Sequence, residues 1–454
     1  MEQGARSMER EARSLGQEAN AGGAPFRKTW RVLLFGLSLQ RKKEVMRTVI
    51  KSLAALSAAL MLFAVQACKE KTDPFDDNVY LISSERELTY TESNILTLLN
   101  IAKGVYPGVS QIISDVEGGV IVYSVTYNTT FKGEDVIASG IIAVPSVPGS
   151  YPVLAYQNGT NTLYANAPSV NPELTLYQLI ECAASTGYVV VMTDYLGFGV
   201  SEEIAHSYLH KESTVQTVVD MFRALQEFDE DIAKDITVSN EYYLMGYSQG
   251  GWATMALLEA MENDYAADFN TAGSSCGSGP YDISYFNNWL LGLTEYPMPS
   301  FVGYISNAYK SHGLITNPLS EIFNDPYAGR IPGLYDGMHS TGQINDQLSE
   351  LVAVLFRPEY ISGYAASPSY QNIRTAMTEN SVQGWDCNIP LLLLHGAADT
   401  YVPEVLSQRM YDAMIGAGTS TSTCAYVKLD GIDHGSGIVP AGLAGLAFFK
   451  SLRQ

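Results

Sequence analysis

Basic residues are scarce in this 454-residue chain, and their scarcity disfavours one large class of partners. The chain has 27 Lys and Arg against 48 Asp and Glu. From residue 68 onward the balance is 16 basic against 43 acidic residues, a formal charge of −27. A surface this acidic repels the phosphate backbone of nucleic acids. We therefore expect no nucleic-acid partner.

Cysteines and nucleotide-binding motifs are also sparse. Five cysteines in a chain of this length are too few for a disulfide scaffold, and their spacing matches no zinc pattern. One bridge or a set of buried free thiols would both fit the four cysteines after Cys68, which are Cys182, Cys276, Cys387 and Cys424. The chain has no P-loop, and the glycine pattern after the early strands lacks G-x-G-x-x-G. We expect no metal and no organic cofactor.

The apolar run near the N-terminus is too short to span a bilayer comfortably. Residues 46–67 carry two basic residues, then an apolar stretch, then a small residue, which is the layout of a secretory signal peptide. The stretch ends in "VQAC", which resembles a bacterial lipobox, in which the cysteine is lipidated and becomes the mature N-terminus. We therefore predict a lipoprotein signal peptide at 46–67 and lipidation of Cys68.

This interpretation places the protein in the cell envelope, held at a membrane by a lipid anchor and either periplasmic or surface-exposed. The alternative is an uncleaved membrane anchor. Residues 1–45 do not fit a signal peptide and are interpreted as an over-extended, disordered start.

The rest of the chain alternates between strand-like and helix-like patterns from about residue 115. "GGVIVYSVTYNTT" and "EDVIASGIIAVP" are β-branched runs that predict a hairpin. "YPVLAYQNG", "GYVVVMTDY" and "YYLMGYS" are nearly continuous apolar runs, as in central parallel strands, and helix-like segments separate them. The pattern predicts an α/β fold with a mostly parallel central sheet flanked by helices.

The alternation stops for about a hundred residues before the last strands. Residues 283–385 are rich in Tyr, Phe, Trp and Pro with weak helical signals, which predicts a largely helical lid. We therefore divide the mature chain into a tether and N-terminal segment (68–114, with a polar tether over 69–90), a first core part (115–282), the lid (283–385) and a second core part (386–454).

"YYLMGYSQGGWA" holds the pattern G-x-S-x-G, with Ser248 between Gly246 and Gly250. A sharp strand-to-helix turn of this kind lifts the serine above a sheet, and only glycine lets the neighbouring backbone pass so closely. The turn also puts Ser248 at a helix N-terminus, where the positive end of the dipole favours a developing oxyanion. Ser248 is the candidate nucleophile; the alternative is an ordinary turn that contains a serine.

A serine hydroxyl needs a base, and the base needs an orienting carboxylate, in the chain order Ser, acid, His. His434, in the glycine-rich "GIDHGSG", is the candidate base. Asp399 follows the apolar run "IPLLLLHG", 35 residues before it, and is the candidate acid. Asp433 is the rival, but adjacent residues of an extended segment point to opposite faces. Asp386 precedes the strand and would lie at the wrong end of the sheet.

The other five histidines fit the role of base less well. His206 and His210 precede the elbow, and although they lie at helical spacing, no third ligand for zinc is near. His312 and His339 fall in the predicted lid. His395 precedes its own candidate acid.

An oxyanion hole needs two backbone N–H groups. One is expected from Gln249, the residue after the nucleophile. The other is expected from the loop after "YPVLAYQNGT", around Gly159 and Thr160.

Three further residues are candidates for binding substrate, namely Asn158 in that loop, Tyr247 in the elbow and Tyr195 in "TDYLGFGVS". Structural support of the 193–201 loop is the alternative role for Tyr195 and its neighbour Asp194. Aromatic residues of the lid would either contact an apolar substrate or form the core of the lid; they are Trp289, Tyr296 and Phe301.

These segments together resemble the α/β-hydrolase superfamily from about residue 115 to the C-terminus. "YQNGT", "TDYLGFG", "GYSQGG", "HGAADTYVP" and "DHG" fall in that family's order, and the insertion between elbow and acid is similar to the secretory lipase and bacterial esterase branch. The resemblance implies Ser248 as nucleophile, Asp399 as acid and His434 as base. The chain departs from many relatives in having Asn158-Gly159 where they have His-Gly.

The leading hypothesis is therefore a serine esterase or lipase that cleaves small-molecule, lipid or glycan esters through an acyl-enzyme. A polysaccharide acetyl or feruloyl esterase would suit an anchored envelope protein equally. A peptidase of the prolyl-oligopeptidase kind would share the triad, but residues 69–115 are too short to supply its propeller. The rival outside enzymes is a catalytically inactive surface lipoprotein that uses the cleft to bind a glycan or lipid.

Overall fold

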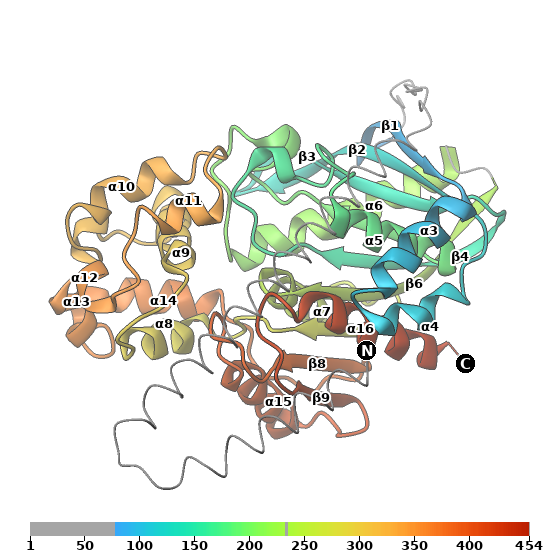
Figure 1. Cartoon of the computed structure of the whole chain (residues 1–454). Helices are drawn as coiled ribbons and strands as arrows, with labels where there is room; N and C mark the ends of the chain where they lie inside the picture. Colours follow the sequence, from blue (N-terminus) through green and yellow to red (C-terminus); the bar gives the residue numbers. More distant parts are fainter. Residues whose placement is uncertain (1–77, 232–234, 454) are drawn as a thin grey trace, which may run out of the picture. The chain divides into compact units, whose positions relative to one another are not determined.

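Nine strands form one mixed sheet in the computed structural model, which describes residues 78–231 and 235–453 (Figure 1). They are β1 (Leu81–Tyr90), β2 (Val120–Phe131), β3 (Glu134–Pro145), β4 (Gly149–Gln157), β5 (Val189–Thr193), β6 (Ile236–Tyr247), β7 (Thr271–Gly277), β8 (Leu391–Gly396) and β9 (Cys424–Leu429). Their order across the sheet is β1-β2-β3-β5-β4-β6-β7-β8-β9.

The pairing of the strands divides the sheet into two parts. β1, β2, β3 and β5 pair antiparallel with one another in that order, and β2 and β3 form the predicted hairpin. The other five pairings, from β5 through β4 to β9, are parallel. The prediction of a mostly parallel sheet is confirmed.

Helices cover both faces of this sheet. One face carries α6 (Lys211–Asp231), α7 (Gln249–Asn263) and α15 (Val405–Ala417), whose apolar side chains join the main core. The other face carries α3 (Glu92–Lys103), α4 (Ser110–Ile113), α5 (Thr175–Glu181) and α16 (Ile438–Leu452). Apolar residues on both sides of the parallel strands explain their continuous apolar sequences. Short 3-10 turns connect the elements at Pro107–Val109, Tyr164–Asn166, Cys182–Thr186 and Gly199–Ser201.

Between β7 and β8 the chain forms seven helices, which lie together at one end of the sheet in Figure 1. The predicted largely helical insertion is therefore confirmed. The helices are α8 (Ile283–Leu291), α9 (Pro299–Ser311), α10 (Tyr327–Leu334), α11 (Thr341–Asn345), α12 (Val352–Leu355), α13 (Pro358–Gly363) and α14 (Gln371–Glu379), with 3-10 turns at Leu319–Glu321 and Pro368–Tyr370.

The polar tether predicted over residues 69–90 is wrong from Leu81 onward. Residues 81–90 form β1, which pairs with β2 along its length. The segment looks polar because β1 is an edge strand with mostly half-exposed side chains. The carboxylate of Glu227 in α6 accepts hydrogen bonds from the N–H groups of Val79, Tyr80 and Leu81, which fixes the start of the strand.

The remaining N-terminal predictions lie outside the described residues, including the signal peptide at 46–67 and the lipidation of Cys68. Within the part that the structure describes, no helix combines the length and apolar character needed to cross a membrane. The four cysteines of that part are buried free thiols.

Candidate active site

The turn between β6 and α7 has the geometry of a nucleophile elbow. Ser248 adopts φ 61° and ψ −123°, a backbone conformation that costs free energy for any residue with a side chain. Its N–H donates to the carbonyl of Gly277 in β7 at 2.8 Å, which holds the turn against the sheet. A Cβ atom at Gly250 would collide with the carbonyl oxygen of Gln157, so only glycine fits this position.

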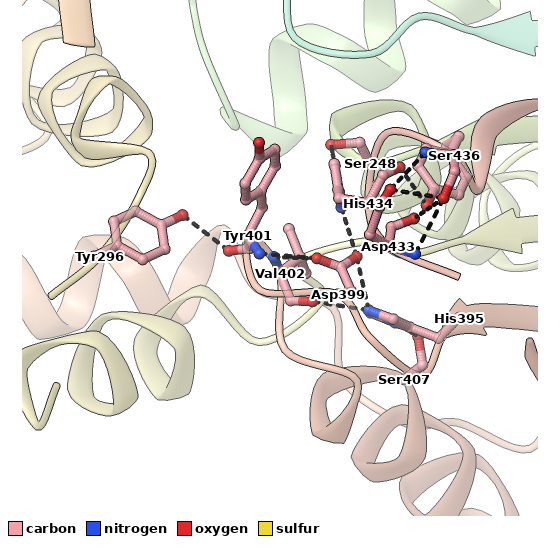
Figure 2. Close-up of polar contacts among 11 residues, drawn as sticks. Ser248, Tyr296, His395, Asp399, Tyr401, Val402, Ser407, Asp433, His434 and Ser436 are labelled. Atoms are coloured by element: carbon pink, nitrogen blue, oxygen red, sulfur yellow. Dashed lines mark hydrogen bonds and ion pairs between the residues drawn. The ribbon is translucent and has the colours of Figure 1, made fainter. Parts of the chain in front are cut away.

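Ser248, His434 and Asp399 form a connected chain of hydrogen bonds (Figure 2). The Nε2 atom of His434 lies 2.8 Å from Oγ of Ser248, and its Nδ1 lies 2.6 Å from Oδ2 of Asp399. Because an ionised carboxylate only accepts, Nδ1 of His434 carries the proton and Nε2 accepts from the serine hydroxyl. The three residues come from the turns after β6, β8 and β9, 186 and 35 positions apart along the chain.

Asp399 is held ionised in spite of its burial. Burial alone would raise its pKa, but contacts with His395 and His434 outweigh that effect and lower the pKa to about 2. The second carboxylate oxygen, Oδ1, accepts from the backbone N–H groups of Tyr401 and Val402, each at 2.9 Å. The carboxylate is thus fixed at both oxygens.

The two rival acids lie elsewhere. Asp433 accepts from the N–H and the hydroxyl of Ser436 at 2.8 and 2.7 Å, which caps the turn that carries His434. Asp386 lies beside Gly418, after α15, where an added Cβ would be 3.0 Å from the Asp386 carboxyl carbon. Of the three acids, Asp399 is the one that contacts the His434 ring.

The predicted oxyanion loop runs beside the elbow. Gln157, at the end of β4, is in register with Gly246 of β6, so the next residues pass the elbow on the neighbouring strand. A Cβ at Gly159 would lie 3.6 Å from the carbonyl oxygen of Tyr247. Gln249 is the first residue of α7, where backbone N–H groups have no partner within the helix. The loop and the helix start therefore bring donor groups near Ser248.

The three predicted substrate-binding residues are all buried, and their described contacts are with the protein itself. Asn158 donates through Nδ2 to the carbonyl of Thr193 at 2.6 Å. The hydroxyl of Tyr247 donates to the carbonyl of His434 at 2.9 Å, and the two rings lie 5.3 Å apart. The hydroxyl of Tyr195 donates to the carbonyl of Asn158 at 3.4 Å. These contacts hold the turn that carries His434 and the predicted oxyanion loop in place.

The 193–201 loop is anchored by its buried aspartate. Asp194 accepts from the N–H of Ser169 at 2.9 Å and from the hydroxyls of Ser139 and Ser169. The structural role that the sequence left open for Asp194 is thus the one its contacts describe.

The predicted lid packs against Tyr401, in the turn that follows Asp399. Ser248 and His434 are each only 8% exposed, so little of either side chain meets solvent. The ring of Tyr401 lies 5.4 Å from that of His434, and Phe301 of α9 lies 6.5 Å beyond Tyr401. Tyr296 donates its hydroxyl to the carbonyl of Tyr401 at 2.9 Å (Figure 2). Trp289 packs on Phe286 and Tyr296 inside the lid.

A stack of aromatic rings joins the lid to the oxyanion loop. Tyr304 of α9 lies between Tyr208 and Tyr335, with ring centroids 4.3 and 4.5 Å apart. The hydroxyl of Tyr208 is 2.8 Å from Oγ1 of Thr160, in the predicted oxyanion loop. Sequence reasoning missed Tyr208 and Tyr304, because tyrosines more than ninety positions apart give no signal of a stack until the chain folds.

His206 lies beside this aromatic stack, with its ring 6.0 Å from Tyr208 and 5.5 Å from Tyr304. Its Nδ1 donates to the carbonyl of Leu196 at 2.7 Å, so Nε2 is free to accept from the side-chain amide of Gln249 at 3.4 Å. Burial lowers the pKa of His206 to about 4, which keeps the ring neutral near pH 7. In the described part of the chain, no group of three or more His, Cys, Asp or Glu side chains is arranged to hold a metal ion.

Comparison with known proteins gives matches of two kinds. Residues 166–294 match the family described as secretory lipase. A Legionella pneumophila protein, assigned to the hydrolases only provisionally, is 24% identical, with 83% of this chain and 98% of that chain covered and a TM-score of 0.73. No curated protein matches the chain.

Two further solved structures are enzymes. The rice cell wall degrading esterase LipA from Xanthomonas oryzae is 25% identical, with 81% of this chain and 95% of that chain covered and a TM-score of 0.69. Lipase A from Candida antarctica is 18% identical, with 69% and 73% covered and a TM-score of 0.54. The chain has an α/β-hydrolase fold and is similar to secretory lipases, as its motifs predicted.

Proposed function

We propose that this protein is a serine hydrolase that cleaves carboxylic esters through an acyl-enzyme. The similarity to secretory lipases and to esterase structures supports ester hydrolysis in general. The serine mechanism is carried by one observation: Ser248, His434 and Asp399 are joined by hydrogen bonds of 2.8 and 2.6 Å, with the serine on a strained elbow.

In the proposed mechanism, Oγ of Ser248 attacks the ester carbonyl while Nε2 of His434 takes the hydroxyl proton. His434 then gives that proton to the leaving alcohol, which leaves the acyl group on Ser248. A water molecule attacks the acyl group with His434 again as base, which releases the acid and regenerates the serine. Asp399 keeps the proton on Nδ1 and stabilises the imidazolium that forms in each half.

Backbone N–H groups of Gln249 and of the Gly159–Thr160 loop are proposed to stabilise the tetrahedral oxyanion. The N-terminus of α7 adds the positive end of its dipole at the same place. Tyr208 would hold the loop in position through its contact with Oγ1 of Thr160, which is 2.8 Å away.

A fluorophosphonate probe, which reacts with activated serines, tests this proposal. We expect it to label the wild type and to fail with Ser248→Ala. Ser451→Ala is the matched control, because Ser451 is exposed at the end of α16 and its hydroxyl donates to the backbone carbonyl of Phe448. Equal labelling of wild type and Ser248→Ala would refute the mechanism. An unlabelled wild type that binds lipid or glycan tightly would instead favour the inactive binding protein.

Two candidate functions differ in the kind of ester that is cleaved. LipA, which is described as degrading the rice cell wall, favours an esterase acting on polysaccharide esters. The secretory lipase match favours lipid esters. Rates on p-nitrophenyl esters of increasing chain length separate the two: a steep fall beyond acetyl supports the polysaccharide esterase, and activity that persists at long chains supports a lipase.

We also propose that the protein is exported and anchored through a lipid on Cys68, with residues 283–385 acting as a lid. The anchor is supported by the sequence "VQAC", which ends an apolar stretch that follows two basic residues. Cys68→Ser is expected to move the protein from the membrane fraction to the soluble fraction without changing the rate of ester hydrolysis. Retention of Cys68→Ser in the membrane fraction would favour an uncleaved membrane anchor.

A further inference from the structure

A second histidine lies against the proposed catalytic acid. His395, in β8, is fully buried, and its Nε2 is 3.3 Å from Oδ2 of Asp399 (Figure 2). The same oxygen accepts the hydrogen bond from His434 at 2.6 Å. One buried carboxylate oxygen is thus flanked by two imidazole rings, and the proposed mechanism uses only one of them.

The contacts of His395 define which of its nitrogens carries a proton. Nε2 also lies 2.9 Å from the carbonyl of Val402, and because a carbonyl only accepts, Nε2 is the protonated nitrogen. Nδ1 is 2.7 Å from the hydroxyl of Ser407 in α15, which donates to it when the ring is neutral. Both nitrogens are therefore held, and the N–H edge of the ring faces the turn of residues 399–402.

We propose that His395 is a positioning residue for Asp399. Its Nε2–H closes the 399–402 turn through the carbonyl of Val402, and the same turn supplies the two N–H groups that hold Oδ1 of Asp399. The positive edge of the ring next to Oδ2 restricts the carboxylate to the orientation that faces His434. The inference rests on the proposed function, because it gives His395 a role only where Asp399 orients a catalytic base.

The position of His395 has a second consequence, for the charge on Asp399. A donor beside a carboxylate stabilises its negative charge and so weakens its pull on other protons. His395 therefore moderates the attraction of Asp399 for the proton on His434. When this donor is removed, the carboxylate becomes more basic and holds the proton on Nδ1 of His434 more strongly, which favours the imidazolium form of the ring.

Other titratable groups surround this pair, but in the described part of the chain only His395 and His434 contact the carboxylate of Asp399 with their side chains. Glu404, at the start of α15, is paired with Lys428 at 2.9 Å. Asp433 on the loop after β9, Tyr247 on β6 and Tyr296 in the lid lie within electrostatic reach of Asp399. Tyr281, before α8, lies against Ser407, the partner of His395.

The inference is tested by measuring kcat/KM for p-nitrophenyl acetate as a function of pH. The wild type is compared with His395→Leu and His395→Gln. The acid limb of this profile reports the pKa of the catalytic base in the free enzyme. We expect His395→Leu to lower kcat roughly 10- to 100-fold, the range for a misoriented catalytic group, with little change in KM. We expect it also to move the acid limb to higher pH. His395→Gln, which keeps an N–H donor, should recover most of both effects.

Two further variants keep the test decisive. His339→Leu is the matched control, because His339 also pairs with an aspartate, through Nδ1 to Asp336 at 2.8 Å, but is partly exposed in the lid. It should leave the profile unchanged. If His395→Leu does not fold, Ser407→Ala takes its place, because it removes only the partner of Nδ1; a smaller shift of the acid limb in the same direction is expected.

An unchanged acid limb and an unchanged kcat per probe-labelled serine in His395→Leu would overturn the positioning role. So would a Gln variant no better than the Leu variant, since a role limited to filling space would not depend on a donor. These results differ from failure of the proposed function, in which the wild type itself would show neither ester hydrolysis nor labelling that depends on Ser248.

Discussion

Two parts of the molecule contact the same site in different ways. One is the edge formed by the carboxyl ends of the parallel strands, here called the sheet edge, and the other is the lid. Ser248 follows β6 directly, and Asp399 and His434 lie in the short loops after β8 and β9, so strand register and backbone hydrogen bonds fix their places. The lid instead contacts the core through apolar side chains of the main core and through side-chain hydrogen bonds, among them tyrosine hydroxyls that donate to backbone carbonyls of the core. These bonds run from Tyr296 to Tyr401, from Tyr304 to Asn161 and from Tyr309 to Leu209.

This difference indicates that the sheet edge and the lid have separate roles. In the proposed mechanism the chemistry depends on backbone geometry, which tolerates almost no change in side-chain size at the elbow. The tyrosine hydroxyls between lid and core are single groups, each worth about 1 kcal/mol, which can be removed one at a time. We therefore expect changes at the sheet edge to abolish turnover and changes in the lid to alter access and KM.

The largest effect is expected for Asp399→Asn. An asparagine at the acid position favours the wrong tautomer of His434, which should lower kcat by about 10⁴-fold with KM little changed. Steady-state kinetics on p-nitrophenyl acetate measures this. Asp433→Asn is the comparison, because Asp433 contacts the turn and not the His434 ring. Equal losses in the two variants would contradict the assignment of the acid.

Gly250→Ala should give the next largest effect. Its Cβ would meet the carbonyl of Gln157, so we expect a loss of stability of more than about 2 kcal/mol and loss of probe labelling. Gly342 in α11 of the lid is the matched control, since a Cβ there meets nothing within 4 Å. Gly342→Ala should be neutral or slightly stabilising in urea unfolding. Similar behaviour of the two variants would remove the contrast between sheet edge and lid.

A smaller effect is expected for Tyr304→Phe. The variant keeps the ring between Tyr208 and Tyr335 but loses the hydrogen bond to the carbonyl of Asn161. We expect a cost of about 1 kcal/mol in stability and a change of a few-fold in KM, with kcat nearly unchanged. A hundredfold loss of kcat would instead place Tyr304 in the chemistry.

The smallest effect on turnover is expected at His210, which contributes to the pH dependence of stability. Burial lowers the pKa of His210 to about 4, so between about pH 6.5 and 4 the unfolded chain holds a proton that the folded chain lacks. Stability therefore falls as the pH falls through this window. His210→Asn should reduce this fall by on the order of 2 kcal/mol in urea unfolding. An equal change in His339→Asn, at a partly exposed histidine, would argue against burial as the cause.

The sequence predicted the parts of this molecule that depend on local pattern and chain order. Continuous apolar runs marked β4, β5, β6 and β8, and the loops after β6, β8 and β9 supplied Ser248, Asp399 and His434, which the fold brings together. β1 was mistaken for a tether because an edge strand needs little apolar surface. β7, "TAGSSCG", gave no signal because small residues there make room for α7: a Cβ at Gly251 would meet the carbonyl of Gly277.

Contacts between distant segments were beyond sequence reasoning. His395 was set aside as a base because it precedes the acid, although its spacing of four positions from Asp399 across the end of β8 could have suggested a contact. Tyr401 immediately follows the acid loop, yet its place between Phe301 and His434 depends on the packing of the lid.

The most direct test of the serine mechanism is the mass of the enzyme trapped during turnover. Wild-type protein mixed with p-nitrophenyl butyrate, quenched in acid and digested, should carry one butyryl group on the peptide that contains Ser248. His434→Ala, which lacks the base, should carry none under the same conditions. A butyryl group on another residue, or steady ester hydrolysis in Ser248→Ala, would contradict the account.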